Sequence, residues 1–404
     1  SRFASLGFPT ARNENWKYTN LSGAAAISNA WLREHAGVPF SSASITRPGQ
    51  AESTLLRQID ANWIVIRNGS VDMNSLERTR KNYGAVINFS HLSDRTAECD
   101  IDVDDPMSAF NAALLLDGLH ISVSPDSDSL TPLGILQIDD PSQQASQVRI
   151  VLEIGRSSSL RIVECALSAN HGAQFTNAVI QASIASNACL SHVRLQLRGD
   201  EHVGVSRITA TLDRDARFHH DAFDFGGSLT RNDVVAIIAG TNAQVRLHGL
   251  YLASGNQHID NHTRVEHRVG PAVSDEEYRG VLSGRSRAVF NGQAVVFKGA
   301  DGTDANQSNH NLLLSSQAEI DTKPELEIYA DDVKCSHGAT VGQLDEASLF
   351  YLRSRGLDQG EAKRLLTQAF ASEFLSELSV EVCREYLTST LDERLADLVS
   401  DRHL

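Results

Sequence analysis

Apolar residues along this chain follow two different periods, and the change between the periods divides the sequence. From about residue 119 to residue 343, short runs alternate between apolar and polar positions, which is the period of a β-strand. The clearest runs are 148–154, 160–167, 193–197, 208–212, 245–252 and 295–298. Hardly any helical period occurs among them, so we expect a β-domain over residues 119–343.

A recurring phrase within this region indicates how the strands are connected. Ala188, Ala216 and Ala243 each lead into an alternating run, and the intervals between them are 28 and 27 residues. Two strands and two turns fill such an interval, which predicts one coil of a stacked solenoid. A sandwich or barrel is the rival fold, but hairpin signals are scarce, Asn291-Gly292 being the main one. The strict six-residue repeat of a left-handed hexapeptide helix is absent.

Residues 1–118 form an N-terminal region of mixed character. The runs 63–66 and 85–89 read as short strands, and residues 105–118 read as a helix. Pro106 suits the first turn of that helix, and Gly118 suits the position just past its end.

Residues 344–404 have a helical period. Asp345 is placed to cap a helix that stops at Gly356, and Asp358 with Glu361 makes a capping pair for a second helix. A third helix is expected over 380–398. The second helix carries an apolar stripe at i, i+3 and i+4 spacing: Ala362, Leu365, Leu366, Ala369, Phe370, Phe374 and Leu378. Such helices can cover one end of a solenoid or offer a groove to a partner.

Composition narrows the class of protein. The 404 residues are 41% hydrophobic and 22% charged, as in a globular domain, and no apolar run is long enough for a membrane span. The net charge of −15 argues against a nucleic-acid partner, because that affinity depends on Lys and Arg. Five dispersed cysteines do not form a disulfide framework, so we expect reduced thiols and a cytoplasmic protein.

Signatures of catalysis are missing from the β-region. It contains no phosphate-binding loop, no dinucleotide fingerprint and no nucleophile elbow. A carbohydrate-active β-helix enzyme is an alternative, for which Asp221 and Asp224 are the nearest carboxylates. The histidines His258, His262 and His267 lie close together, but polar ladders along solenoid turns explain them better than a metal site. We therefore expect a protein that is not an enzyme.

Cys335 and His337 stand apart, because they are two residues apart in an extended segment. Side chains at i and i+2 of a strand share one face, so this thiol and imidazole can meet the same metal ion or cluster. Two ligands are too few for thiolate or imidazole metals, which usually take about four. Further ligands have to come from elsewhere in the chain or from another subunit. The alternative to a metal site is a structural role, with Cys335 as a small core residue and His337 as a hydrogen-bonded polar residue.

Several long motifs carry a family resemblance that covers nearly the whole chain. They are ENWKYT (14–19), HIDNHTRVEH (258–267), YRGVLSG (278–284), ADDVKCSHGATVG (330–342) and LFYLRSRG (349–356). Together they resemble the SufB/SufD family, the scaffold subunits of the SufBCD iron–sulfur cluster assembly complex. The segment CSHGAT is similar to the SufD branch, because the SufB branch reads more like EHEAT at this place.

This resemblance implies a fold and a set of partners. Members have a right-handed parallel β-helix with two strands per coil, and act as non-catalytic scaffolds with the SufC ATPase. In the SufD branch, the histidine that matches His337 lies at the contact with SufB and shares a nascent cluster with a SufB cysteine, and the cysteine that matches Cys335 lies nearby. A transient iron–sulfur cluster is thus expected between partners and none on this chain alone.

The resemblance also assigns the C-terminal helices to SufC. The residues expected at that contact are Leu365, Leu366, Ala369, Phe370 and Phe374. It allows a homodimer of the isolated chain as well. A SufB-like homo-oligomer that holds a cluster without a paralogue is the remaining alternative.

Overall fold

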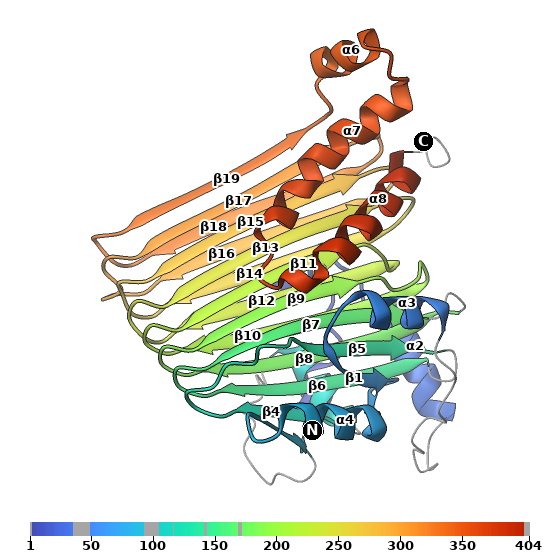
Figure 1. Ribbon diagram of the computed structural model, residues 1–404. Coiled ribbons are helices and arrows are strands. Elements are labelled where there is room, and N and C mark those ends of the chain that lie inside the picture. Colours follow the sequence, from blue (N-terminus) through green and yellow to red (C-terminus); the bar gives the residue numbers. More distant parts are fainter. Residues whose placement is uncertain are drawn as a thin grey trace.

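The computed structural model describes residues 2–34, 49–92, 105–115, 117–140, 144–168 and 172–399. Within these ranges a stack of strands is flanked by helices near both ends of the chain (Figure 1). The elements that precede the repeated coils are α1 (Phe3–Leu6), η1 (Glu14–Trp16), α2 (Ser22–Glu34), α3 (Gln50–Gln58), β1 (Asn62–Arg67), β2 (Ser70–Val71), α4 (Met73–Tyr83), β3 (Ile87–His91) and α5 (Pro106–Leu114).

The coils themselves contain sixteen strands, most of them eight to eleven residues long. They are β4 (Leu119–Val123), β5 (Leu133–Asp139), β6 (Ala145–Ile154), β7 (Ser159–Ser168), β8 (Gln174–Ile184), β9 (Cys189–Gln196), β10 (His202–Leu212), β11 (Arg217–Asp224), β12 (Leu229–Ile238), β13 (Gln244–Ala253), β14 (His258–His267), β15 (Val273–Leu282), β16 (Arg287–Val296), β17 (Asp304–Leu313), β18 (Glu319–Ile328) and β19 (Lys334–Gly342). After them come α6 (Glu346–Ser354), α7 (Gln359–Ser372), η3 (Glu373–Glu377), η4 (Glu381–Cys383) and α8 (Arg384–Val399).

Successive strands alternate between two sheets, as the predicted parallel β-helix with two strands per coil requires. Sheet A has ten strands in the order β19-β17-β15-β13-β11-β9-β7-β5-β1-β2, and sheet B has nine in the order β18-β16-β14-β12-β10-β8-β6-β4-β3. Among the described strands only the pairs β1–β2 and β3–β4 are antiparallel. Cys189, Arg217 and Gln244 are aligned on neighbouring strands, which reproduces the predicted spacing of the coils.

The recurring phrase before these strands is a turn with a left-handed residue. Asn187, Asp215 and Asn242 have φ of 60°, 61° and 60°, a region that Asn and Asp tolerate better than most residues. Each is followed by a fully buried alanine, where only a small side chain fits beneath the turn. The repeat that the sequence shows is therefore the corner of the coil.

The N-terminal region supplies strands to both sheets. The predicted runs 63–66 and 85–89 correspond to β1, which pairs with β5, and β3, which pairs with β4. The predicted helix 105–118 is correct at its start, where the Asp105 side chain accepts a hydrogen bond from the Ser108 amide, but it ends earlier, at Leu114. Gly118 does not cap it. A Cβ there would lie 2.4 Å from Leu92, so glycine allows close approach of the chain instead.

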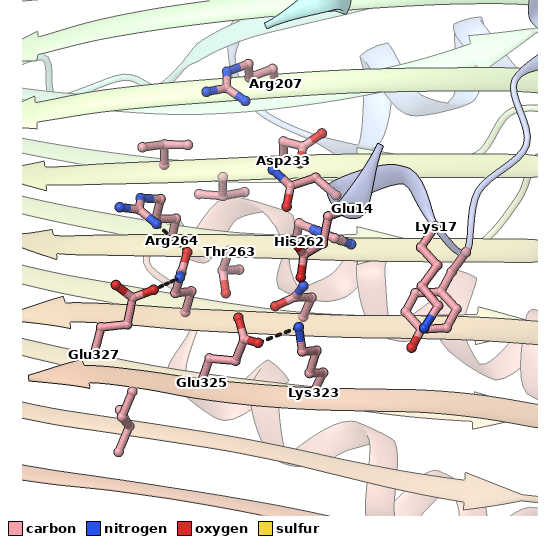
Figure 2. Close-up of a pocket in the computed structure, with 17 residues that line it drawn as sticks. Glu14, Lys17, Arg207, Asp233, His262, Thr263, Arg264, Lys323, Glu325 and Glu327 are labelled. Atoms are coloured by element: carbon pink, nitrogen blue, oxygen red, sulfur yellow. Dashed lines mark hydrogen bonds and ion pairs between the residues drawn. The ribbon is translucent and has the colours of Figure 1, made fainter. Parts of the chain in front are cut away.

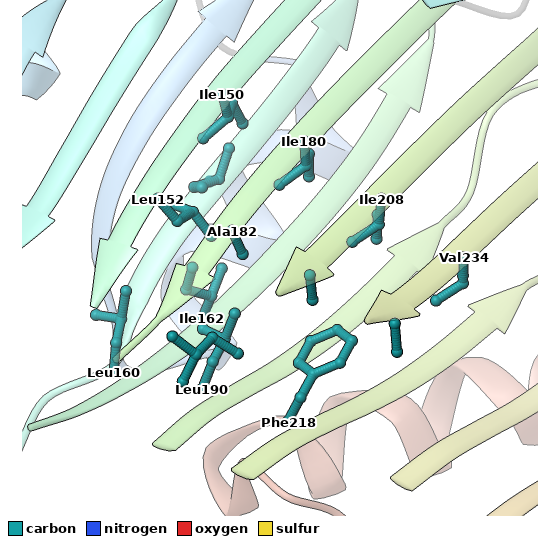
Figure 3. Close-up of a cluster of buried hydrophobic side chains, with 14 of the residues drawn as sticks. Ile150, Leu152, Leu160, Ile162, Ile180, Ala182, Leu190, Ile208, Phe218 and Val234 are labelled. Carbon is teal, nitrogen blue, oxygen red and sulfur yellow. The ribbon is translucent and has the colours of Figure 1, made fainter. Parts of the chain in front are cut away.

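Apolar side chains form three layers. The central layer lies between the two sheets and contains residues such as Ile150, Ile180 and Ile208 (Figure 3). A second layer lies between sheet A and helices α3, α7 and α8, and a third lies between sheet B and helices α2 and α5. Both outer faces of the solenoid are thus partly covered, which explains the near-continuous burial of strands such as β5.

The C-terminal helices begin largely where the sequence predicts. Asp345 accepts a hydrogen bond from the Ser348 amide at the start of α6, and Asp358 forms a capping box with Glu361 at the start of α7. The third helix starts later than predicted, at Arg384, because a short 3-10 turn precedes it.

Two tyrosines inside the solenoid lie against glycines of the neighbouring strand. Tyr278 of β15 is aligned with Gly249 of β13, and Tyr251 of β13 is aligned with Gly280 of β15. A Cβ at Gly249 would lie 2.2 Å from the Tyr278 ring, and one at Gly280 would lie 2.2 Å from the Tyr251 ring. Glycine at these positions leaves room for aromatic rings in the space between the sheets.

We expect Gly249→Ala to lower the free energy of unfolding by about 1–3 kcal/mol, since an added methyl group in a filled core forces the Tyr278 ring to move. Chemical denaturation followed by circular dichroism measures the change. Gly338→Ala on β19 is the matched control, because nothing lies within 4 Å of a Cβ there. Equal stability of the Gly249→Ala and Gly338→Ala proteins would contradict this account of the core.

Candidate functional site

The strand that carries Cys335 and His337 is the last of sheet A. β19 is paired with β17 on one side only, and no described strand pairs with its other side. β18 occupies the same position in sheet B. The final coil therefore presents two unpaired edges, which leave a row of backbone donors and acceptors open to another strand.

The register settles which way the two candidate ligands face. Ala305 and Gln307 of β17 are buried inside the solenoid, and they are aligned with Cys335 and His337 of β19. Because aligned residues of neighbouring strands point to the same face, Cys335 and His337 belong to the interior rows of the coil. None of the described strands forms a further coil over them, and His337 is exposed while Cys335 is half-buried. The structure thus places both at the open end of the interior.

The chemical state of the thiol follows from this position. Partial burial raises the pKa of Cys335, and the nearby Asp304 carboxylate adds to the rise. A thiolate is the form that binds metal, so the neutral thiol is the resting form until a cation or a partner lowers that pKa. Within the described ranges, no three His, Cys, Asp or Glu side chains gather closely enough to hold a metal ion.

The interior row of His337 continues into the solenoid through two polar residues that sequence analysis missed. Gln307 on β17 is aligned with Glu276 on β15, so Glu276, Gln307 and His337 follow one another on consecutive strands of sheet A. The Gln307 Nε2 donates to Glu276 Oε2 at 3.3 Å, and the Thr263 hydroxyl of sheet B donates to Glu276 Oε1. The alternation of polar and apolar residues along β15 can be recognised in the sequence. The register that aligns β15 with β19 through β17 cannot.

Burial raises the pKa of Glu276 to about 7, because the carboxyl group lies in the core and no cation of the described part of the chain faces it. The other carboxylates on the inward faces of the described strands each have a cationic or histidine partner. These contacts are Asp139 with Arg198 at 2.8 Å, Glu164 with His192 at 2.9 Å and Asp224 with Arg194 at 2.8 Å. Glu276 is the exception among them.

The carboxylates of the enzyme alternative do not form a pair. Asp221 lies on the outer face of sheet A and accepts from the Ser379 amide at 2.8 Å, whereas Asp224 lies inside and contacts Arg194. His219 and His220 likewise lie on opposite faces, as their adjacency predicts, and His220 is fully buried beside His192. This region therefore lacks the facing carboxylates that glycoside hydrolysis uses.

Two of the three histidines in the segment 258–267, His258 and His262, lie where the N-terminal segment is attached, whereas His267 is buried 2.8 Å from the Ser274 hydroxyl. Thr19 contacts His258 at 3.2 Å and donates to Asp260, and His262 lies 3.0 Å from Asp260. Asp260 also binds the buried guanidinium of Arg231 at 2.6 Å.

Arg231 completes the attachment from the neighbouring strand. It stacks on Trp16 at 4.6 Å and donates to the Asn15 carbonyl at 3.0 Å. The two motifs ENWKYT and HIDNHTRVEH, 239 positions apart at Thr19 and His258, thus meet in one polar network on sheet B.

A polar groove lies beside this network. It has a volume of about 730 Å³ and runs between residues 14–18 and side chains of β10, β12, β14, β16 and β18 (Figure 2). Cations and anions alternate along it, as in the ion pair between Lys323 and Glu325. Neither sign of charge is in excess among the lining residues, so the groove shows no preference for an anionic or a cationic ligand.

The five residues predicted to contact a partner are divided between two faces of the C-terminal helices. Leu365 and Ala369 are exposed, Leu366 and Phe370 are half-buried, and Phe374 is buried 5.2 Å from the His248 ring. The Phe374 ring thus has no free surface to offer in this arrangement.

Two aromatic side chains that the stripe did not include are more exposed. Phe350 and Tyr351 on α6 have 74% and 57% of their surface exposed. Helix α6 lies beyond β19, past the open edge of the solenoid (Figure 1). The sequence signal for this exposed aromatic pair is the motif LFYLRSRG, which places two aromatic residues in one helical turn without an apolar stripe that would bury them.

One polar cluster anchors the C-terminal helices to sheet A. Arg279 of β15 lies 5.1 Å from the Phe374 ring and donates to the Phe370 carbonyl at 2.9 Å. Arg246 of β13 donates to the Glu377 carbonyl at 3.0 Å.

None of the described helices has both the length and the apolar character that crossing a membrane needs.

We expect Glu276→Gln to change how stability depends on pH. In the folded chain the carboxyl group stays protonated up to about pH 7, whereas an ordinary glutamate ionises near 4.5, so the folded state binds more protons between these values. Wild-type stability therefore falls as pH rises through this window, by roughly 3 kcal/mol from this group. The variant should lack that part of the fall.

Chemical denaturation of both proteins at pH 5 and pH 8 measures the difference. Asp275→Asn on the same strand is the matched comparison, because a hydrogen bond from His248 lowers the pKa of Asp275, so this carboxylate is ionised at both pH values and its removal should leave the pH dependence unchanged. Identical pH profiles for wild type and Glu276→Gln would contradict the burial of an unpaired carboxyl group.

Comparisons with known proteins give a consistent result. Residues 136–370 match the family model described as SUF system FeS cluster assembly, SufBD core domain. The chain is 30% identical over 393 residues to the iron–sulfur cluster assembly protein SufD of Escherichia coli, covering 96% of this chain and 90% of that protein. It is 28% identical to a SufBD family protein of Synechocystis, covering 98% of this chain and 88% of that protein. It is also 26% identical to SufD of Bacillus subtilis, over 73% of this chain and 68% of that one.

Proposed function

The chain belongs to the SufBD family of the SUF iron–sulfur cluster assembly system, and we propose that it serves there as a cytoplasmic, non-catalytic scaffold of the SufD type. Its proposed task is to complete, with a SufB subunit, a site at which a cluster is built. A SufC ATPase docked on its C-terminal helices supplies the energy. The cluster is transient and shared, so this chain holds none when alone.

The observation that carries this proposal is the unpaired edge of the last coil. β19 presents free backbone groups beside Cys335 and His337, so a strand of another subunit can extend sheet A and bring its own ligands to the same place. Exposed apolar residues at this end, Tyr329 and Val341, favour burial against a partner. A cluster needs about four ligands, of which one chain supplies two here.

The position of the C-terminal helices supports a link between ATPase docking and the edge. Only three residues join the end of β19 at Gly342 to the start of α6 at Glu346. Helix α6 exposes Phe350 and Tyr351, and α7 exposes Leu365. A partner that moves these helices therefore pulls on the strand that carries His337.

We expect His337→Ala to lower the iron and sulfide content of the assembled complex several-fold while SufB and SufC still copurify. Removing one side chain rarely dissolves a large interface, whereas an incomplete ligand set does not hold a cluster. Anaerobic purification from cells, followed by iron and sulfide assays and cluster absorbance, measures the change. Cys335→Ser should cause a smaller loss.

His310→Ala is the matched control, since His310 lies on the adjacent strand but on the outer face, where it contacts Thr340. A His337→Ala complex with full cluster content would leave this histidine with a structural role only. Absence of SufB and SufC from the native preparation would reopen the SufB-like homo-oligomer and the carbohydrate-active enzyme. Activity on acidic glycans would support the latter.

We expect Tyr351→Asp combined with Leu365→Asp to reduce SufC recovery at least tenfold without unfolding the chain. Both side chains are exposed, so the charges cost little in the free subunit but would be buried at a contact. Copurification with a tagged chain measures the loss. Leu130→Asp, at an exposed apolar residue in the first coils, should leave recovery unchanged. Normal SufC recovery with the double variant would place the docking surface elsewhere.

A further inference from the structure

The interior of the last coils contains a carboxyl group that lacks a counter-charge. Glu276 is 1% exposed, and among the described residues it contacts the Thr263 hydroxyl and the Gln307 amide but no cation. Every other inward carboxylate on the described strands has an arginine or histidine within 3 Å. A buried carboxylate without a positive partner is unfavourable unless something else supplies the charge.

Gln307, the next residue along the same row, has an unused acceptor. Its Nε2 donates toward Glu276, while its Oε1 is buried and has no hydrogen-bond partner. An orphaned amide oxygen inside a protein costs free energy, and such groups are rare in native structures. The carboxylate and the orphaned oxygen belong to consecutive residues of one row, and the third member of that row is the exposed His337.

The opposite sheet packs closely against the Glu276 carboxyl group. Gly292 of β16 has no side chain, and a Cβ there would lie 3.2 Å from Glu276 Oε1 and 2.9 Å from the Phe290 ring. A larger residue would therefore press on the carboxyl group from sheet B. Because β19 is the last described strand of sheet A, the row ends at the exposed His337, while Gln307 and Glu276 lie buried behind it.

We propose that Glu276, Gln307 Oε1 and His337 form a binding site for ferrous iron inside the open end of the solenoid. The backbone positions of Glu276 and His337 are two strand spacings apart, roughly 10 Å, so a metal ion between their side chains lies next to Gln307. The ion supplies the missing positive charge and uses the orphaned oxygen. That this iron is destined for a cluster rests on the proposed function; the site itself does not.

The donor set selects the class of metal. Carboxylate and amide oxygens with one imidazole nitrogen suit a divalent ion of intermediate character such as Fe(II) or Co(II), whereas Mg²⁺ and Ca²⁺ prefer oxygen alone. Cys335 lies one interior position away from His337 on the same strand, where its softer sulfur is available when sulfide arrives. The site therefore holds iron next to the place proposed for cluster formation.

The experiment uses the full chain, without partners, and Co(II) alone as an anaerobic probe of the Fe(II) site. Calorimetric titration and the visible absorbance of bound Co(II) measure affinity and ligand type. Glu276→Gln and His337→Ala should each lower the affinity at least tenfold, and Gln307→Leu should lower it by a smaller factor. Asp275→Asn, a carboxylate on the same strand but on the outer face, should bind Co(II) as wild type does.

The conservative Glu276→Gln variant guards against misfolding, because the glutamine side chain can still accept the hydrogen bond from Thr263. The melting temperature of each variant, measured beside the titration, checks that the chain is folded. Wild-type affinity in Glu276→Gln, or no Co(II) binding by the wild-type chain, would overturn the proposal. The proposed function is tested separately, by copurification of SufB and SufC and by cluster loss in the His337→Ala complex. The iron site and the proposed function can therefore fail independently.

Discussion

The backbone hydrogen bonds between successive coils are the interaction on which the rest of this molecule depends. Each strand of a parallel solenoid satisfies its amides and carbonyls on the coils before and after it, so the stack is stable only where it continues or is closed. At the N-terminal end, short antiparallel pairs close it: β2 pairs with β1 in sheet A, and β3 pairs with β4 in sheet B. At the other end, β18 and β19 are each paired on one side only within the described chain.

Helices from both ends of the chain lie on the outer faces of the sheets and bury apolar side chains there. On sheet A the later coils hold the helices through charged contacts, such as those of Arg279 with the end of α7. Helix α6 follows β19 almost directly and projects past the edge (Figure 1). The exposed edge and the exposed helix are therefore neighbours along the chain, separated by three residues.

The buried polar groups inside the solenoid differ between the early and the later coils. The early coils neutralise each buried acid with a nearby base, whereas Glu276 in the later coils has only neutral contacts. Buried charges are thus paired in the early coils, and the buried carboxyl group without a cation among the described residues lies near the open end. Gly292 and the orphaned oxygen of Gln307 belong to the same local arrangement.

The sequence by itself determined the period of the coils, the position of the strands and the caps of the last helices, because these depend on local patterns. The 27–28-residue spacing between buried alanines, the capping residues Asp345 and Asp358, and the pairing of Cys335 with His337 on one face were all readable in this way. The family motifs in the sequence also indicated the family to which the chain belongs.

Only the tertiary structure decided what those residues face. Register between strands placed Gln307 beside His337 and Glu276 beside Gln307, although the sequence separates the outer two by 61 positions. Packing buried Phe374 and exposed Phe350, although a helical stripe predicted the first at a partner contact. Such relations arise from contacts between coils, and no local period along the chain encodes them.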